Sequence, residues 1–339
     1  MGDEATVRDG TIVAASSASP ASVGRTTLGR RLRAAFIIGL TWLACRLPEP
    51  PLIALTDLAG SVWYRLGGQR RRRAERNLGL VTRWMATNRV GSDRGRAAAS
   101  DQRAFATLVR DAFRHLVRYN IVLARGATMD AEYVRSRFVL DTPGATEWVL
   151  GGPPGPLFVG LHMGSMELPA YYLSGLTGRT AVAPVERLRD PLLQSYMVAS
   201  RLRMGLRLVE LHAARRELVA GLRQGDPAGI AGDRDLTGGG IEVQFFGAPA
   251  SLPVGPALIA MEAGVTPNVF GIRRTADGRY HARIVRIAIP DEGTRRERVT
   301  AYLAAEAHAF ERLIAEAPEQ WFAVFFPIWG DAVLDEALA

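Results

Sequence analysis

The 339-residue sequence contains no lysine, so arginine supplies every basic side chain apart from five histidines. The lack of lysine excludes a Walker-type phosphate loop and a Schiff-base enzyme, because both need the lysine amine. A single cysteine, Cys45, excludes a disulfide framework and a cysteine-rich metal cluster within one chain. The net charge of +8 is therefore carried by arginine, whose planar guanidinium suits recognition of phosphate and carboxylate groups.

The N-terminal region also lacks an apolar run long enough to cross a bilayer. Its uninterrupted apolar or neutral run covers residues 34–45, short of the roughly 20 residues that a spanning helix needs. Arg30, Arg31 and Arg33 precede the run, and Trp42 and Arg46 lie near its end. These flanks favour a helix that lies on a membrane surface over a signal peptide or a core helix.

Composition divides the chain into three parts. Residues 1–29 are mostly small and polar and are predicted to form a disordered tail. Residues 30–85 are predicted to be a membrane-associated helical segment, in which "PEPP" at 48–51 separates two helices. Its arginine cluster, residues 70–73 with Arg76, is either a solvated helix face or a surface that meets anionic headgroups. Residues 86–330 are predicted to form an α/β domain, with 30–330 as one structural unit.

Short strands alternate with helices from residue 156 onward. Helices are expected at 166–176, 191–205, 214–225, 255–264 and 295–317, and strands at 156–161, 180–186, 206–211, 227–231, 241–247, 266–272 and 280–289. This alternation predicts an α/β fold with a mostly parallel central sheet flanked by helices.

One strand-to-helix turn carries a histidine and a glutamate. In "PLFVGLHMGSMELP", residues 156–169, His162 is expected at the carboxyl end of a strand, where open α/β sheets place their sites. Gly164 permits the turn, Ser165 is expected to cap the next helix, and Glu167 is expected in its first turn. Glu167 would then fold back and orient His162 as a base. The alternative is a helix-capping glutamate beside an incidental histidine.

Two further groups of charged residues follow strands. Asp233, Arg234 and Asp235 come after "AGIA", and Glu186 and Arg187 follow another strand. On its own, the group at 233–235 is more typical of a salt-bridged loop end than of a functional site. Arg201, on the helix after Glu186, is by itself compatible with an ordinary surface arginine.

The order of these motifs resembles a known family. The histidine and glutamate motif, "VERLRDP", an arginine on the next helix and "DRDLTGGGIEVQFFGAPASLPVGPALIAMEAG" occur in this sequence over roughly residues 30–330. They resemble the lysophospholipid-acyltransferase-like superfamily, in the branch of lipid A late acyltransferases and phosphatidylinositol mannoside acyltransferases. "RRRRAERNLGL" also looks like that branch, and the tail "APEQWFAVFFPIWGD" is similar to the mannoside enzymes. The motif "HMGSME" departs from the Trp-Asp ending usual in the mannoside enzymes, which leaves the acceptor open.

The resemblance implies an O-acyltransferase that moves a fatty acyl group from acyl-CoA or acyl-carrier protein to a glycolipid hydroxyl. His162 would be the general base, with Glu167 and Asp233 as the two carboxylates that compete to orient it. Glu186, Arg201 and Arg234 would bind substrate. No cofactor or metal is implied, and the enzyme would be peripheral or monotopic at an anionic surface, on the cytoplasmic face of the bacterial inner membrane.

Two other functions remain open from the sequence. A lipid or thioester hydrolase would use the same residues to activate water. A nucleic-acid-binding protein would explain the basic charge, but aromatic residues do not alternate with the arginines as stacking platforms would. We therefore expect no nucleic acid partner.

Overall fold

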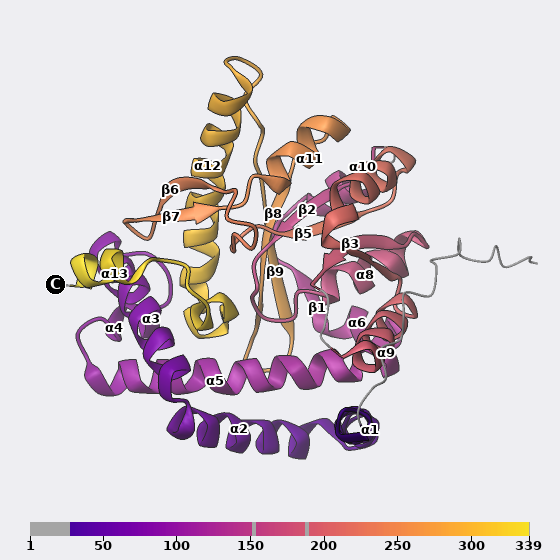
Figure 1. Ribbon diagram of the computed structural model, residues 1–339, viewed down its shortest axis with the longest axis vertical. Coiled ribbons are helices and arrows are strands. Elements are labelled where there is room, and N and C mark those ends of the chain that lie inside the picture. The colour runs from indigo at the N-terminus through magenta and orange to yellow at the C-terminus, as the bar shows by residue number, and fades with distance from the viewer. Residues whose placement is uncertain (1–27, 151–153, 187–189, 339) are drawn as a thin grey trace, which may run out of the picture.

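A seven-stranded mixed sheet forms the centre of the molecule, and helices cover both of its faces (Figure 1). The computed structural model describes residues 28–150, 154–186 and 190–338. The strand order is β1-β9-β8-β2-β5-β3-β4. The strands are β1 (Phe138–Leu140), β2 (Leu157–Gly160), β3 (Ala181–Val185), β4 (Leu206–Glu210), β5 (Ala228–Ala231), β8 (Asn268–Arg274) and β9 (Tyr280–Arg286). Within this sheet, β8 and β9 are the only described strands that pair antiparallel, so the predicted α/β fold with a mostly parallel sheet is confirmed.

Two groups of helices bury opposite faces of this sheet. One face packs against α6 (Ala131–Arg137), α7 (Ala145–Leu150) and α8 (Leu168–Thr177), and the other against α10 (Ala214–Gln224), α11 (Gly255–Ala263) and α12 (Arg295–Glu316). The helix α9 (Pro191–Leu202) contacts the edge strand β4. Side chains on α12 and in the C-terminal segment, including Phe310 and Trp321, are fully buried in the larger core.

Residues 28–125 form five helices, where the sequence predicts two helices up to about residue 80, a loop at 86–104 and a helical pattern from residue 105 onward. These are α1 (Leu28–Ala44), α2 (Glu49–Leu66), α3 (Gly68–Asn88), the short α4 (Asp93–Ala97) and α5 (Gln102–Arg125). The expected second helix is divided at Gly67 into α2 and α3. The helix α2 lies along the outside of α5, where a carboxylate of Asp57 accepts hydrogen bonds from Arg118 (Figure 1). At Gly60, an added Cβ would lie 2.5 Å from Cα of Arg114, so this close helix packing requires glycine.

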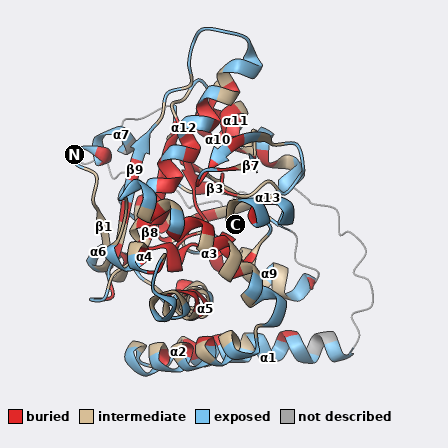
Figure 2. Cartoon of the chain, turned by 90° about the vertical axis from the view of Figure 1, so that its left-hand side faces the viewer, coloured by how far each residue is buried: buried red, intermediate tan, exposed pale blue. Residues whose placement is uncertain are grey.

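The outer surfaces of α1 and α2 are largely exposed (Figure 2). Many of their exposed residues are large and apolar. On α2 they follow one stripe, opposite the stripe that packs on α5. The exposed residues are Leu28, Leu32, Phe36, Ile37, Leu40, Trp42 and Leu43 on α1 and Leu55, Leu58, Val62 and Leu66 on α2. None of the helices in the described ranges combines the length and hydropathy of a membrane-crossing segment.

A separate hairpin carries the "FFG" sequence. The strands β6 (Ile241–Phe245) and β7 (Ala248–Leu252) pair only with each other among the described strands, so 241–247 is not a further strand of the central sheet. Phe246 turns the chain at a φ of 54°, and its backbone amide donates to Glu311 Oε1 at 2.5 Å. The hairpin thereby directs Phe245 and Phe246 into the core, beside the C-terminal turns η3 (Pro318–Gln320) and η4 (Phe322–Phe325). The last helix, α13 (Asp331–Leu338), packs on α3.

Candidate active site

His162 lies just beyond the carboxyl end of β2 and is paired with Asp233. The strands β2 and β5 are parallel neighbours with Gly160 opposite Ala231, so the residues that follow them meet at one edge of the sheet. His162 Nδ1 is 2.6 Å from Asp233 Oδ1, and the backbone N–H of His162 donates to Asp233 Oδ2 at 2.9 Å. The structure thus brings together the histidine and the later of the two candidate carboxylates.

The position of Asp233 keeps it charged and keeps His162 basic. Burial alone would raise the pKa of Asp233, but its contacts with His162 and its hydrogen bond from Trp321 hold this pKa below the usual range. For His162, burial lowers the pKa, and the charge and hydrogen bond of Asp233 outweigh this effect, so the pKa is raised above 6.5.

A charged carboxylate at Nδ1 also selects the tautomer of His162. The proton sits on Nδ1, and Nε2 becomes the atom with a free lone pair. No residue in the described ranges hydrogen-bonds to Nε2, and the side chain is 25% exposed. His162 therefore presents an oriented and accessible base.

Glu167 lies away from this pair and binds other groups. It occupies the position before α8 rather than the expected first turn. The carbonyl of Ser165 accepts from the amide of Leu168, and no backbone amide in the described ranges donates to the Ser165 side chain, so the expected Ser165 cap is not formed. Glu167 Oε1 accepts a hydrogen bond from Tyr119 at 2.9 Å and lies 3.6 Å from the Arg201 guanidinium. Its other carboxylate oxygen is buried without a hydrogen-bond partner among the described residues. The expected contact between Glu167 and His162 is therefore not formed.

The structure shows that Arg201 is buried, although the sequence alone was compatible with an ordinary surface arginine. Its side chain is buried, lies on α9 and faces Glu167. Tyr119 comes from α5 and was not singled out in the sequence, where it reads only as part of a helical pattern. Burial, followed by the nearby Glu167 carboxylate, raises the pKa of Tyr119 well above its usual range, so this hydroxyl remains a donor.

Arg234 and Glu186 form a second pair close to His162. Their charged groups are 3.7 Å apart, with Glu186 largely exposed and Arg234 largely covered. The Arg234 guanidinium also lies 3.6 Å from the centre of the Phe326 ring. These charges act on the base, since Arg234 lowers the pKa of His162 and Glu186 raises it. Arg187 lies outside the described residues.

A tight turn at Gly164 links His162, which pairs with Asp233, to Glu167, which contacts Tyr119 and Arg201. Gly164 has a φ of 59°, and an added Cβ would lie 2.1 Å from the carbonyl oxygen of Ile272. This confirms that the turn requires glycine. The backbone N–H of Gly164 donates to the carbonyl of Gln320, and the carbonyl of His162 accepts from Phe322 at 2.6 Å. The C-terminal segment therefore holds the turn after His162 in place.

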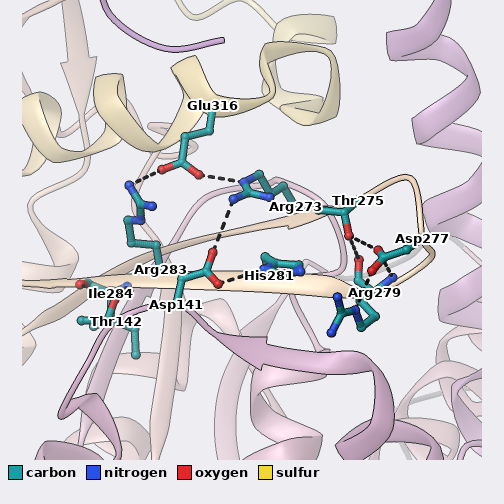
Figure 3. Close-up of polar contacts among 10 residues, drawn as sticks. All are labelled: Asp141, Thr142, Arg273, Thr275, Asp277, Arg279, His281, Arg283, Ile284 and Glu316. Carbon is teal, nitrogen blue, oxygen red and sulfur yellow. Dashed lines mark hydrogen bonds and ion pairs between the residues drawn. The ribbon is translucent and has the colours of Figure 1, made fainter.

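The chain contains a second aspartate–histidine pair in a different setting (Figure 3). His281 Nδ1 is 2.8 Å from Asp141 Oδ1, but Asp141 also lies 3.4 Å from Arg273. Arg273 in turn bonds to Glu316, which also binds Arg283. This network joins β8 and β9 to α12. It has the character of a surface ion-pair cluster because both members of the His281 pair are partly exposed.

Within the described ranges, no three histidine, cysteine, aspartate or glutamate side chains gather in a way that could hold a metal ion.

Known proteins resemble this chain over the region that carries the site. Residues 95–326, well over half of the chain, match a family described as bacterial lipid A biosynthesis acyltransferase. A phosphatidylinositol mannoside acyltransferase of Mycolicibacterium smegmatis is 30% identical over 183 residues, which cover 52% of this chain and 58% of that protein. Phosphatidylinositol mannoside acyltransferases from strains of Mycobacterium tuberculosis are 33% identical over 107 residues, 30% of this chain and 34% of theirs. Each match thus spans less than two thirds of the relative.

Proposed function

Because the chain belongs to the bacterial lipid A biosynthesis acyltransferase family, we propose that it transfers a fatty acyl group to a hydroxyl group of a glycolipid. The observation that carries the proposal is the free Nε2 of His162, opposite a buried and charged Asp233. The proposed donor is a thioester, either acyl-CoA or acyl-carrier protein. A phosphatidylinositol mannoside is the preferred acceptor, on the strength of the names of the relatives.

In the proposed reaction, His162 acts as a general base. Its Nε2 accepts the proton of the acceptor hydroxyl while the oxygen attacks the thioester carbonyl carbon, forming the C–O bond. The resulting tetrahedral oxyanion collapses, the C–S bond breaks, and the departing sulfur receives the proton from His162. Asp233 holds the ring and stabilises the transient imidazolium, so neither a metal nor a covalent enzyme intermediate is required.

Two features support stabilisation of the oxyanion in this proposal. The backbone amides of Ser165 and Met166 donate to no described residue, whereas the Gly164 amide is already used by Gln320. Arg234 places a positive charge near His162. Donors and a charge fixed in advance lower the energy of a developing oxyanion without reorganisation. In the same proposal, Glu186 and Arg201 contact or shape the substrate site, and Glu167 holds Arg201.

We also propose that α1 and α2 place the enzyme on the cytoplasmic face of the bacterial inner membrane as a peripheral or monotopic protein. Their exposed apolar residues are the motivation, together with Arg46, whose guanidinium lies 3.6 Å from the Trp42 ring centre. An interfacial helix of this type buries its apolar side among acyl chains and keeps arginine at the headgroups. Both lipid substrates would then be within reach of His162.

Transfer of a labelled acyl group tests the function directly. Purified protein is incubated with palmitoyl-CoA or palmitoyl-carrier protein and with either a phosphatidylinositol mannoside or a lipid A precursor, and products are identified by mass spectrometry. We expect His162→Ala to lower transfer at least about a thousandfold, because it removes the proposed base. His281→Ala should retain transfer, because His281 pairs with Asp141 in the ion-pair cluster with Arg273 and not with the buried Asp233. Equal transfer by His162→Ala and wild type would refute the proposal. Release of free fatty acid independent of acceptor would indicate a hydrolase instead.

A further inference from the structure

A buried tryptophan touches the carboxylate that orients the base. We propose that Trp321 is a positioning residue, whose indole N–H fixes the Asp233 carboxylate against His162. The inference deepens the proposed function and rests on His162 acting as the base. The main evidence is the hydrogen bond that Trp321 Nε1 donates to Asp233 Oδ2 at 2.8 Å, between two side chains that are both fully buried.

Three donors together determine the orientation of the Asp233 carboxylate. His162 Nδ1 binds Oδ1, while the His162 backbone N–H and the Trp321 indole both bind Oδ2. Without the indole, Oδ2 would retain only one of its two donors, in a place that water does not reach. A buried anion that loses a donor is less stable, so its ability to hold a proton on His162 must change.

The surroundings of Trp321 keep its indole in place. Its ring packs against Phe245, Phe246 and Trp329, with centroid distances of 5.8, 6.1 and 6.2 Å. Its backbone pairs with Met163 in an antiparallel bridge. The "FFG" hairpin and the C-terminal tail, two segments distant in sequence, therefore meet behind the dyad. Together these two segments hold the Trp321 indole N–H in the position from which it donates to Asp233.

Trp329 supplies a matched comparison within the same aromatic cluster. It is also buried, and its indole donates a hydrogen bond, but the acceptor is the backbone carbonyl of Phe245 at 3.3 Å. Replacing either tryptophan by phenylalanine keeps a ring and removes one N–H. Only the change at position 321 removes a donor from Asp233.

Other charges act on the dyad and stay the same in both variants. Arg234 and Glu186 influence the pKa of His162, and the charge of Asp233 in turn raises the pKa of Glu306 on α12. Glu306 is fully buried, and burial raises its pKa well above the usual range, which favours its neutral form. A difference between the two tryptophan variants therefore reports on the indole donor.

The decisive experiment measures the pKa of His162 by NMR in wild type, Trp321→Phe and Trp329→Phe. The deprotonated dyad carries the uncompensated charge and benefits most from the indole. We therefore expect Trp321→Phe to raise this pKa by about one unit and Trp329→Phe to leave it unchanged. An unchanged or lowered pKa in Trp321→Phe would overturn the inference.

Kinetic data form a second arm. In Trp321→Phe, kcat at neutral pH should fall about tenfold, with the acid limb of its pH profile moved upward and KM for the donor unchanged. Because the NMR arm needs no substrate, it tests Trp321 even if acyl transfer is absent. Conversely, if Trp321→Phe transfers acyl groups as wild type does and the pKa of His162 is unchanged, Trp321 is not a positioning residue, while the proposed function still holds.

A further measurement applies if Trp321→Phe does not fold. In wild-type protein labelled with nitrogen-15 tryptophan, one indole signal should move as His162 titrates, and Asp233→Asn should displace the same signal. If no indole signal follows the titration of His162, Trp321 does not act on the dyad as proposed.

Discussion

At the scale of single residues, the same pairing of histidine with aspartate has different consequences in two places. Asp233 is fully buried and, among the described residues, accepts only from His162 and Trp321, so its charge acts mainly on His162. Asp141 is partly exposed and shares its charge between His281 and Arg273 (Figure 3). Burial and the choice of neighbours, rather than the pair itself, therefore favour His162 as the reactive histidine.

The variant Glu167→Gln tests whether Glu167 stabilises the buried charge of Arg201 or acts on the protonation of His162. The amide retains the shape and the contact with Tyr119, but it removes the negative charge beside the buried Arg201 guanidinium. We expect the free energy of unfolding to fall by about 2 kcal/mol, since a buried charge loses its partner. Turnover should fall less than in His162→Ala, with the acid limb of the pH profile in place. A shift of that limb in Glu167→Gln would instead make Glu167 part of the dyad.

The raised pKa of His162 predicts opposite pH dependences for activity and stability. The base must be neutral, so turnover should rise with pH through a pKa above 6.5. The stabilising contribution of the charged pair is fully present below pH 6.5 and is lost as pH rises through the folded-state pKa. Denaturant unfolding of wild type and His162→Gln should therefore differ more at about pH 5.5 than at about pH 9. A difference that grows with pH would contradict the assignment of the His162 pKa.

At the scale of elements, the sequence predicted the parallel part of the sheet because alternating strands and helices leave a clear pattern. It did not predict the β6–β7 hairpin, since periodicity alone does not tell whether a strand joins the central sheet. It placed His162 and Asp233 after strands but left open which acid pairs with His162. That choice depends on the register that sets Gly160 beside Ala231, a contact between distant segments. Trp321 was missed for the same reason, because 88 residues separate it from Asp233.

Close packing of α2 on α5 gives a prediction at this scale. An added Cβ at Gly60 would meet the backbone of α5 at 2.5 Å, so Gly60→Ala should push the helices apart and lower the free energy of unfolding by about 1–3 kcal/mol. Gly39→Ala on α1 is the control, because nothing lies within 4 Å of its added Cβ. Better helix propensity should make that variant neutral or slightly more stable. Equal thermal unfolding midpoints for the two variants would contradict the packing described for α2.

At the scale of the whole molecule, the proposed membrane binding would have two separate contributions, from the net charge of +8 and from the exposed apolar surface on α1 and α2. The charge attracts an anionic surface over about a Debye length and weakens with salt. The apolar contribution is insensitive to salt, because it depends on the area removed from water. The two contributions can therefore be measured independently.

Sedimentation with lipid vesicles tests this division. Leu58 on α2 is 63% exposed and lies on the stripe that faces away from α5, so Leu58→Asp should weaken binding to neutral and anionic vesicles by at least about tenfold. Leu211→Asp, on the turn after β4, is the control at a residue that is 45% exposed and should bind as wild type does. Raising the salt concentration should weaken binding of wild type to anionic vesicles while leaving neutral vesicles unaffected, since arginine attraction alone is screened. If Leu58→Asp sediments with both kinds of vesicle as wild type does, the apolar surface of α2 is not what meets the lipid.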